Sequence, residues 1–138
     1  MSYYLLVFEN TRVPKTKKEF MSWYENLTTW GEDVDYNEIS HTTMSLQNWF
    51  QESIKSFPAM NGSFAPSDEE FNGNEELEER LTDYCVASNA IYMAFAWSVA
   101  EKAYEHVRML ATKHNVGFFN VSSDNGEIIL PDGLKIEC

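Results

Sequence analysis

Basic residues are scarce in this sequence. Ten lysines and arginines stand against 22 aspartates and glutamates, which gives a formal net charge of −12. Proteins that bind nucleic acid tightly neutralise phosphates with cationic side chains, so this composition argues against direct binding to DNA or RNA. We expect the partner of so acidic a chain to be a neutral or basic molecule.

Cysteine and long apolar runs are scarce as well. Cys85 lies in a predicted strand and Cys138 is the last residue, so two free thiols in a reducing compartment are a better interpretation than a disulfide. No apolar run approaches the ~20 residues of a membrane span. The apolar start of the chain ends at Glu9 and has no basic region before it, unlike a secretory signal. We therefore expect a cytoplasmic protein.

Motifs that carry known chemistry are missing. The sequence has no glycine-rich phosphate loop, no G-x-S-x-G nucleophile motif and no calcium-loop spacing. His41, His106 and His114 lack the i, i+4 spacing of a helical metal site. We expect His41 to be exposed, His106 to lie on a buried helix face, and His114 to interact with a helix C-terminus. We predict no catalytic, metal-binding or cofactor-binding residue, no cofactor and no enzymatic activity.

Apolar residues are plentiful, at 43% of the chain, and they fall into alternating patterns of strands and helices. The central unit is a strand at 90–96, a helix at 98–114 and a strand at 116–122. A strand at 84–87 forms a hairpin with the first of these through Ser88 and Asn89. The remaining predicted strands are 3–8 and 127–130.

Two more helices are predicted from capping residues followed by apolar residues at helical spacing. Thr16 and Glu19 have the form of a capping box, and Thr42 or Thr43 can cap the second helix, which Pro58 ends. Ser98 and Glu101 form another capping box before the 98–114 helix, and Asn115 can end that helix in a left-handed conformation. The apolar stripes of the first two helices are Phe20, Trp23, Tyr24 and Leu27, and Leu46, Trp49, Phe50, Ser53, Ile54 and Phe57.

The predicted order of elements is β-α-α-β-β-α-β-β over a single domain, residues 1–138. This order predicts an α+β fold, a two-layer sandwich whose mostly antiparallel sheet carries its helices on one face. The arrangement is loosely ferredoxin-like in its split βαβ elements.

Two acidic segments lie outside these elements. The first, at 31–38, reads as an exposed loop, and the second, at about 63–83, as a long surface loop with room for one helical turn at 75–81. The second segment has eight acids and one base, about seven of the twelve net negative charges. We expect the two loops to converge on one side of the sheet. The predicted partner-binding residues are Glu32, Asp33, Asp35, Glu38, Asp68, Glu69, Glu70, Glu75, Glu76, Glu78, Glu79 and Asp83, with Trp30, Tyr36 and Phe71 among them.

Several segments resemble a family of small, acidic, uncharacterised bacterial proteins, and the resemblance covers most of the chain. The most specific matches are Phe-Pro-Ala-Met-Asn-Gly at 57–62 and Phe-Ala-Trp-Ser at 95–98, with further matches at 4–8, 20–24, 49–50, 90–94 and 116–122. The resemblance brings no catalytic residues with it. In size and acidity the family is similar to immunity proteins, which protect bacteria from contact-dependent or other polymorphic toxins, many of them basic nucleases.

The acidic segments and this resemblance favour one hypothesis: a cytoplasmic immunity protein that binds and neutralises a cognate toxin, expected to be a basic nuclease, through an acidic surface. Two alternatives remain open at the level of sequence. One is a small-substrate enzyme that uses His106 or His114 with a carboxylate in a cleft. The other is an inhibitor that mimics the phosphate spacing of nucleic acid. The oligomeric state is not indicated by the sequence.

Overall fold

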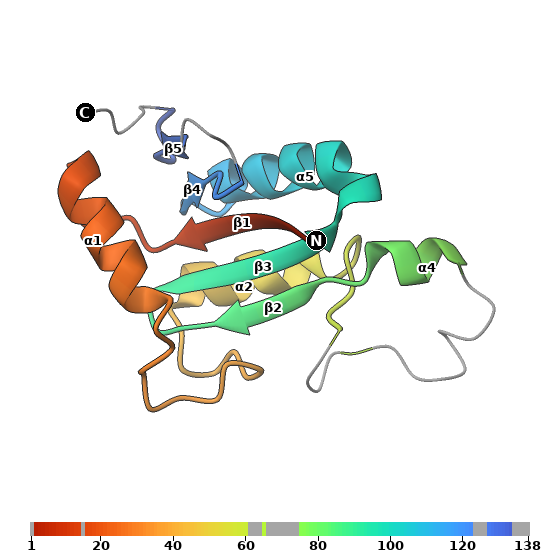
Figure 1. The fold of residues 1–138 in the computed structure, drawn as a ribbon, viewed down its shortest axis with the longest axis horizontal. Coiled ribbons are helices and arrows are strands. Elements are labelled where there is room, and N and C mark those ends of the chain that lie inside the picture. The colour runs from red at the N-terminus through yellow and green to blue at the C-terminus, as the bar shows by residue number, and fades with distance from the viewer. Residues whose placement is uncertain (1, 15, 61–64, 66–74, 123–126, 134–138) are drawn as a thin grey trace.

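A five-stranded antiparallel sheet forms the centre of the molecule (Figure 1). The computed structural model describes residues 2–14, 16–60, 65, 75–122 and 127–133. The α+β class and the antiparallel sheet are as predicted. In the order in which they lie in the sheet, the strands are β2 (Asp83–Val86), β3 (Ala90–Ala96), β1 (Ser2–Phe8), β4 (Gly117–Phe119) and β5 (Ile128–Ile129).

The helical turn predicted at 75–81 in the second acidic segment is present, as a six-residue helix that ends three residues before the start of β2. The helices are α1 (Lys17–Leu27), α2 (Met44–Ser53), α4 (Glu75–Arg80), the 3-10 helix η1 (Trp97–Val99) and α5 (Ala100–Lys113).

The helices cover both faces of the sheet, which differs from the expected single face. Leu5 and Val7 of β1 share a core cluster with α2 and α5, whereas Leu6 and Phe8 share the second cluster with Phe20 of α1. Successive strand residues point to opposite faces, so α1 lies on the face opposite to α2 and α5 (Figure 1). The reason is that β1 is apolar on both sides, with Leu5, Leu6, Val7 and Phe8 all 0% exposed.

Three predicted helix ends are confirmed, at Thr16, Thr43 and Asn115, whereas α2 ends at Ser53, short of the end predicted at Pro58. Thr16 accepts a hydrogen bond from the backbone N–H of Glu19, and Thr43 caps α2 in the same way. Asn115 has a φ of 59° just after α5. The cap predicted at Ser98 is wrong, because Trp97–Val99 form a 3-10 turn and α5 starts only after Val99, which makes no side-chain cap.

The free side of β2, an edge strand, is covered at its C-terminal end. The backbone N–H of Val86 donates to the carbonyl of Tyr36 at 2.8 Å, and the Nε2 of His41 lies 2.7 Å from the carbonyl oxygen of Val86. His41 is therefore half-buried in a hydrogen bond, where the sequence led us to expect an exposed side chain. These contacts fasten the loop after α1 to the sheet.

None of the helices in the described part of the chain combines the length and the apolar content needed to cross a membrane.

Candidate protein-binding surface

Negative charge is concentrated in two segments of the chain. Residues 25–38, which extend the first acidic segment back to Glu25 in α1, contain five acids and no base, and residues 68–83 contain eight acids and one base. These segments contribute −5 and −7, which is the whole formal charge of −12, so the rest of the chain is formally neutral. The chain is thus a neutral scaffold with two strongly acidic parts.

The described parts of these segments lie at opposite ends of β2. The first segment is bonded to Val86, the last residue of β2, and α4 of the second segment ends three residues before Asp83, the first residue of β2 (Figure 1). The expected convergence of the two loops is therefore not seen in the described residues. The described parts of the two segments are separated by the length of β2, a four-residue strand, which is about 13 Å.

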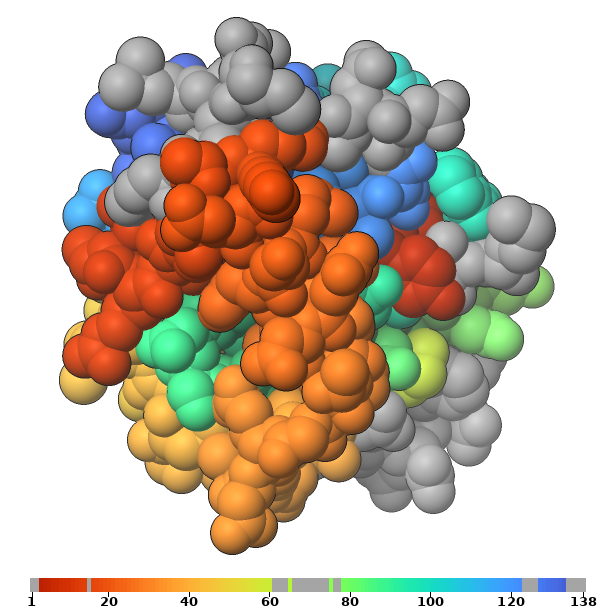
Figure 2. Space-filling view, turned by 60° about the vertical axis from the view of Figure 1, so that its left-hand side comes forward, coloured from red at the N-terminus to blue at the C-terminus, as the bar shows by residue number. Residues whose placement is uncertain are grey.

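The first acidic segment is anchored by one of its own carboxylates. Oε1 of Glu32 accepts hydrogen bonds from the backbone N–H and the hydroxyl of Ser88, at 2.9 and 2.7 Å, in the turn between β2 and β3. The backbone N–H of Glu32 donates to the hydroxyl of Tyr36. Trp30 packs against Tyr36 and Tyr92, so it is half-buried and serves to hold the loop on the sheet. Figure 2 shows this segment and α1, in orange, covering the near side of the molecule.

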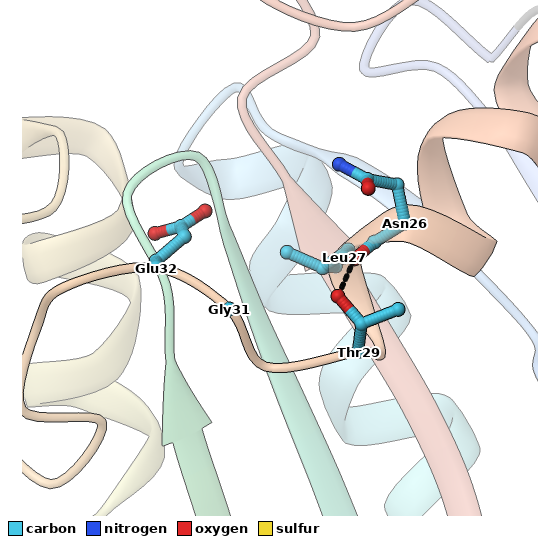
Figure 3. Close-up of a pocket in the computed structure, with 5 residues that line it drawn as sticks. All are labelled: Asn26, Leu27, Thr29, Gly31 and Glu32. Atoms are coloured by element: carbon cyan, nitrogen blue, oxygen red, sulfur yellow. Dashed lines mark hydrogen bonds between the residues drawn. The ribbon is translucent and has the colours of Figure 1, made fainter.

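A small cavity of about 190 Å³ lies between the C-terminal end of α1 and this loop (Figure 3). Asn26, Leu27, Thr29, Gly31 and Glu32 line it, and the hydroxyl of Thr29 donates to the carbonyl of Asn26 at 2.7 Å. The last turn of α1 contains no basic residue, so the negative end of the helix dipole has no cation from its own turn. The described residues that line the cavity include the carboxylate of Glu32 and no base, so the electrostatic potential in the cavity is negative.

A second cavity, of about 310 Å³, lies beside α4 at the other end of β2. We call it the α4 hollow. Ala94 and Ala96 of β3 contribute small side chains to it, and Met60 is 48% exposed beside them. The remaining lining residues are Glu78, Leu81, Asp83 and Phe95, so apolar groups and two carboxylates surround the hollow.

The α4 hollow exists because α1 covers only part of its face of the sheet. Tyr4 pairs with Ala94 across β1 and β3 and is 37% exposed, although the neighbouring Leu6 on the same face is 0% exposed. This opening was not predicted from the sequence. A signal was present in β3, where Ile91, Met93 and Phe95 alternate with the smaller Ala94 and Ala96 toward the strand end.

The predicted partner-binding residues have different surroundings in the structure. Asp68, Glu69, Glu70 and Phe71 lie outside the described residues, and of Glu76 the structure describes only the backbone, within α4. The exposed members are Asp33, Asp35, Glu75, Glu78 and Glu79, and the half-buried members are Glu32, Glu38, Asp83, Trp30 and Tyr36.

A buried polar chain connects α2, β2 and α5. Oγ of Ser53 lies 2.8 Å from the hydroxyl of Tyr84 and 3.0 Å from Nε2 of His106, and Tyr84 donates to the carbonyl of Phe57 at 2.7 Å. Because the one proton of Tyr84 goes to Phe57, Ser53 donates to Tyr84 and His106 donates to Ser53. Burial lowers the pKa of His106 to about 4, which agrees with a neutral imidazole carrying its proton on Nε2.

The directions of these hydrogen bonds differ from those around a serine nucleophile. A serine nucleophile would donate its proton to the histidine, and here it donates to Tyr84 instead. Ser53 is also 0% exposed. Substrate therefore cannot reach its hydroxyl in this conformation, and the chain stabilises the contact between α2 and β2.

A second histidine, His114, also has a side-chain partner, and in its case the partner is a carboxylate. Nε2 of His114 is 2.9 Å from Oε1 of Glu52, and Nζ of Lys113 is 2.8 Å from Oε2 of the same carboxylate. Hydrogen bonds from Lys113 and His114 lower the pKa of Glu52. Neither His114 nor Glu52 lines any of the three cavities of about 190, 310 and 560 Å³ in the described part of the structure. The pair joins the end of α5 to α2.

The described residues form no candidate metal site: no group of three or more histidine, cysteine, aspartate or glutamate side chains among them is arranged to hold an ion. Cys85 has a free thiol in β2, and its pKa is raised by burial and by the neighbouring Asp83.

Comparison with known proteins gave no match: no protein-family model, no curated protein and no solved structure is similar to this chain.

Proposed function

We propose that this chain is an immunity-type protein of the cytoplasm, which binds a basic protein toxin of the nuclease kind and neutralises it through its acidic surface. The observation that carries the proposal is that two segments of the sequence hold the entire net charge, while the rest of the chain is neutral, and that the described parts of these segments lie at the two ends of β2. A partner with a basic face gains from both segments at once.

Electrostatic attraction explains speed and orientation better than it explains affinity. Charges on the acidic segments act over a Debye length of about 8 to 10 Å at physiological salt and raise association rates by about 10- to 1,000-fold. Affinity needs apolar contacts as well. Exposed carboxylates near the two ends of β2, such as Asp33 and Glu78, provide the attraction.

The first acidic segment is attached firmly enough to act as a docking surface. Glu32 is bonded to Ser88, and Tyr36 is bonded to Val86, so the first segment is held to the sheet at two points. Rigid placement of charge lowers the entropy lost on binding. The supporting features are therefore charge, position and attachment.

The direct test is to express the proteins encoded beside this gene in bacteria, one at a time, with and without this chain. We expect one of them to stop growth and this chain to restore it. Purified complex formation is then measured by stopped-flow fluorescence at low and high salt. If no neighbouring protein is toxic or bound, the proposal is wrong.

Charge-removal variants separate the acidic surface from general acidity. Replacing Asp33 and Asp35 by Asn, and Glu75, Glu78 and Glu79 by Gln, is expected to slow association about tenfold at low salt and to flatten its salt dependence. The matched control replaces Glu101 and Glu105, exposed acids of α5 in the neutral part of the chain, and should leave the rate unchanged. Equal rates for both variants would contradict the role of the two segments.

A further inference from the structure

We propose that the α4 hollow is the anchor point of the complex, and that it takes one apolar side chain of the partner that is flanked by lysine or arginine residues. This inference rests on the proposed function and adds the chemistry of the contact. Its basis is the combination of an open apolar cavity and a rim that contains acids.

The hollow has the size and lining of an anchor site. Its volume of about 310 Å³ is about ten times the volume that one water molecule takes in the liquid. Ala94, Ala96 and Leu81 give it apolar walls, and Met60 is 48% exposed. A methionine side chain is flexible and polarisable, so it can adapt to the shape of an inserted group.

The surroundings of the hollow select a basic partner. Glu78 and Asp83 are among its lining residues, and none of the described residues that line it is a base. Arg80, the one base of α4, places its guanidinium over the ring of Phe57, 5.9 Å from the ring centroid. Partner cations beside the apolar side chain would meet the exposed carboxylate of Glu78, which is the arrangement of an apolar centre with a charged rim that is common in tight interfaces.

A second copy of this chain does not fit the same site. The 68–83 segment carries a net charge of −7, so pairing two such segments would bring like charges together. The hollow therefore favours a partner of opposite charge over self-association.

A second hollow provides an internal control. Tyr104, Glu105, Arg108, Met109 and Thr112 line a larger and more open cavity of about 560 Å³ on α5. Met109 is 63% exposed, so it matches Met60 in residue type and accessibility, but its cavity contains the base Arg108. A partner with flanking cations should prefer the α4 hollow.

The test uses two basic pentapeptides, Lys-Arg-Leu-Arg-Lys and Lys-Arg-Ser-Arg-Lys, titrated against the full ¹⁵N-labelled chain at low salt and followed by NMR. We expect the leucine peptide to bind about fivefold more tightly, equal to about 1 kcal/mol from partial burial of one leucine. The largest shift differences between the two peptides should fall on the amides of Ala94 and Ala96.

Two variants and one control locate the effect. Met60→Ser removes an apolar wall, Ala96→Leu fills the hollow, and both should bring the affinity ratio close to one. Met109→Ser should leave it near fivefold. All three positions are exposed, so folding is expected to be retained.

The possible failures are distinct. If both peptides bind the wild-type chain equally and the charge-removal variant weakens both, the anchor site is refuted while the acidic surface stands. If neither peptide binds, or the charge-removal variant binds them as well as the wild type does, the acidic surface is refuted and the proposed function fails with it.

Discussion

Gly117 lies where the sheet has no room for a side chain. It pairs with Phe8 between β4 and β1, and a Cβ at this position would lie 2.2 Å from both Cε2 and Cζ of Phe8. The ring of Phe8 is 0% exposed and is enclosed by Phe20, at 5.0 Å between ring centroids, and Trp23, at 6.2 Å. The substitution Gly117→Ala must therefore move a ring that has no free space beside it.

The size of this effect follows from the distances. An ordinary contact is about 3.5 Å, so Phe8 or β4 must shift by more than 1 Å in a close-packed core. Overpacking of this kind costs about 1 to 3 kcal/mol. We expect the upper end, about 3 kcal/mol, because the ring is fixed from two sides. For a chain of this length the melting temperature should fall by about 10 °C.

Urea unfolding followed by tryptophan fluorescence measures this cost. Gly31→Ala is the control, since its added Cβ would meet nothing closer than Oγ1 of Thr29 at 3.6 Å. The double substitution Gly117→Ala with Phe8→Leu should recover part of the loss. If Gly117→Ala alone changed the free energy of unfolding by less than about 0.5 kcal/mol, the packing described for this face of the sheet would be wrong.

Three further predictions concern polar groups. Tyr84→Phe should lower the free energy of unfolding by about 1 to 3 kcal/mol, measured by urea unfolding, because it leaves Ser53 and the Phe57 carbonyl without their buried partner. The pKa of His106 is lowered to about 4, so its ring protons should show no titration by NMR between pH 8 and 5; the unfolded chain takes up this proton near the model-peptide pKa of about 6.5, and the stability contributed by His106 is therefore present above that pH and is lost as the pH falls toward 4. Glu32→Ala should speed hydrogen exchange at the Ser88 amide, which loses its acceptor.

Each of these predictions has its own contradiction. Tyr4→Phe, at a residue that is 37% exposed, is the control for Tyr84→Phe, and equal effects would contradict the role of the buried hydrogen-bond chain. Replacement of His106 by Gln should flatten the stability profile between pH 6.5 and 4, and an unchanged profile would contradict the assignment. Asp33→Ala should leave the Ser88 amide protected; if it raised exchange as Glu32→Ala does, the bond from Glu32 would not hold this loop.

Local signals in the sequence predicted most of the elements. Thr16, Thr43 and Asn115 are short-range features, since each acts on backbone groups within three residues, and each is found as predicted. The cap at Ser98 failed because Trp97 packs against Tyr3, a contact distant in sequence, and the chain there forms a 3-10 turn.

Tertiary contacts decided what the sequence could not predict. The burial of β1 on both faces was visible in its composition, but the helix that covers each face was not, because Phe20 and Trp49 are equally apolar. His41 was expected to be exposed because no nearby residue explains a bond to Val86, 45 positions away. The α4 hollow was missed for a related reason: an opening depends on where α1 stops covering the sheet.

The position of charge relative to the core also has a physical reason. Thirteen acids in two segments repel one another, so burying them would be costly, and the described parts of both segments lie beyond the ends of β2. The attachments that hold the first segment to the sheet are a hydrogen-bonded carboxylate at Ser88 and a backbone bond at Val86, which need no Lys or Arg. Asp35 and Glu38 of the same segment accept hydrogen bonds from the backbone N–H groups of Asn37 and Ile39, so these carboxylates contribute to the shape of the loop itself. A chain that only needed solubility could spread its acids evenly, whereas concentration of the whole net charge in two segments of an otherwise neutral chain is the arrangement expected of a surface that meets a cation.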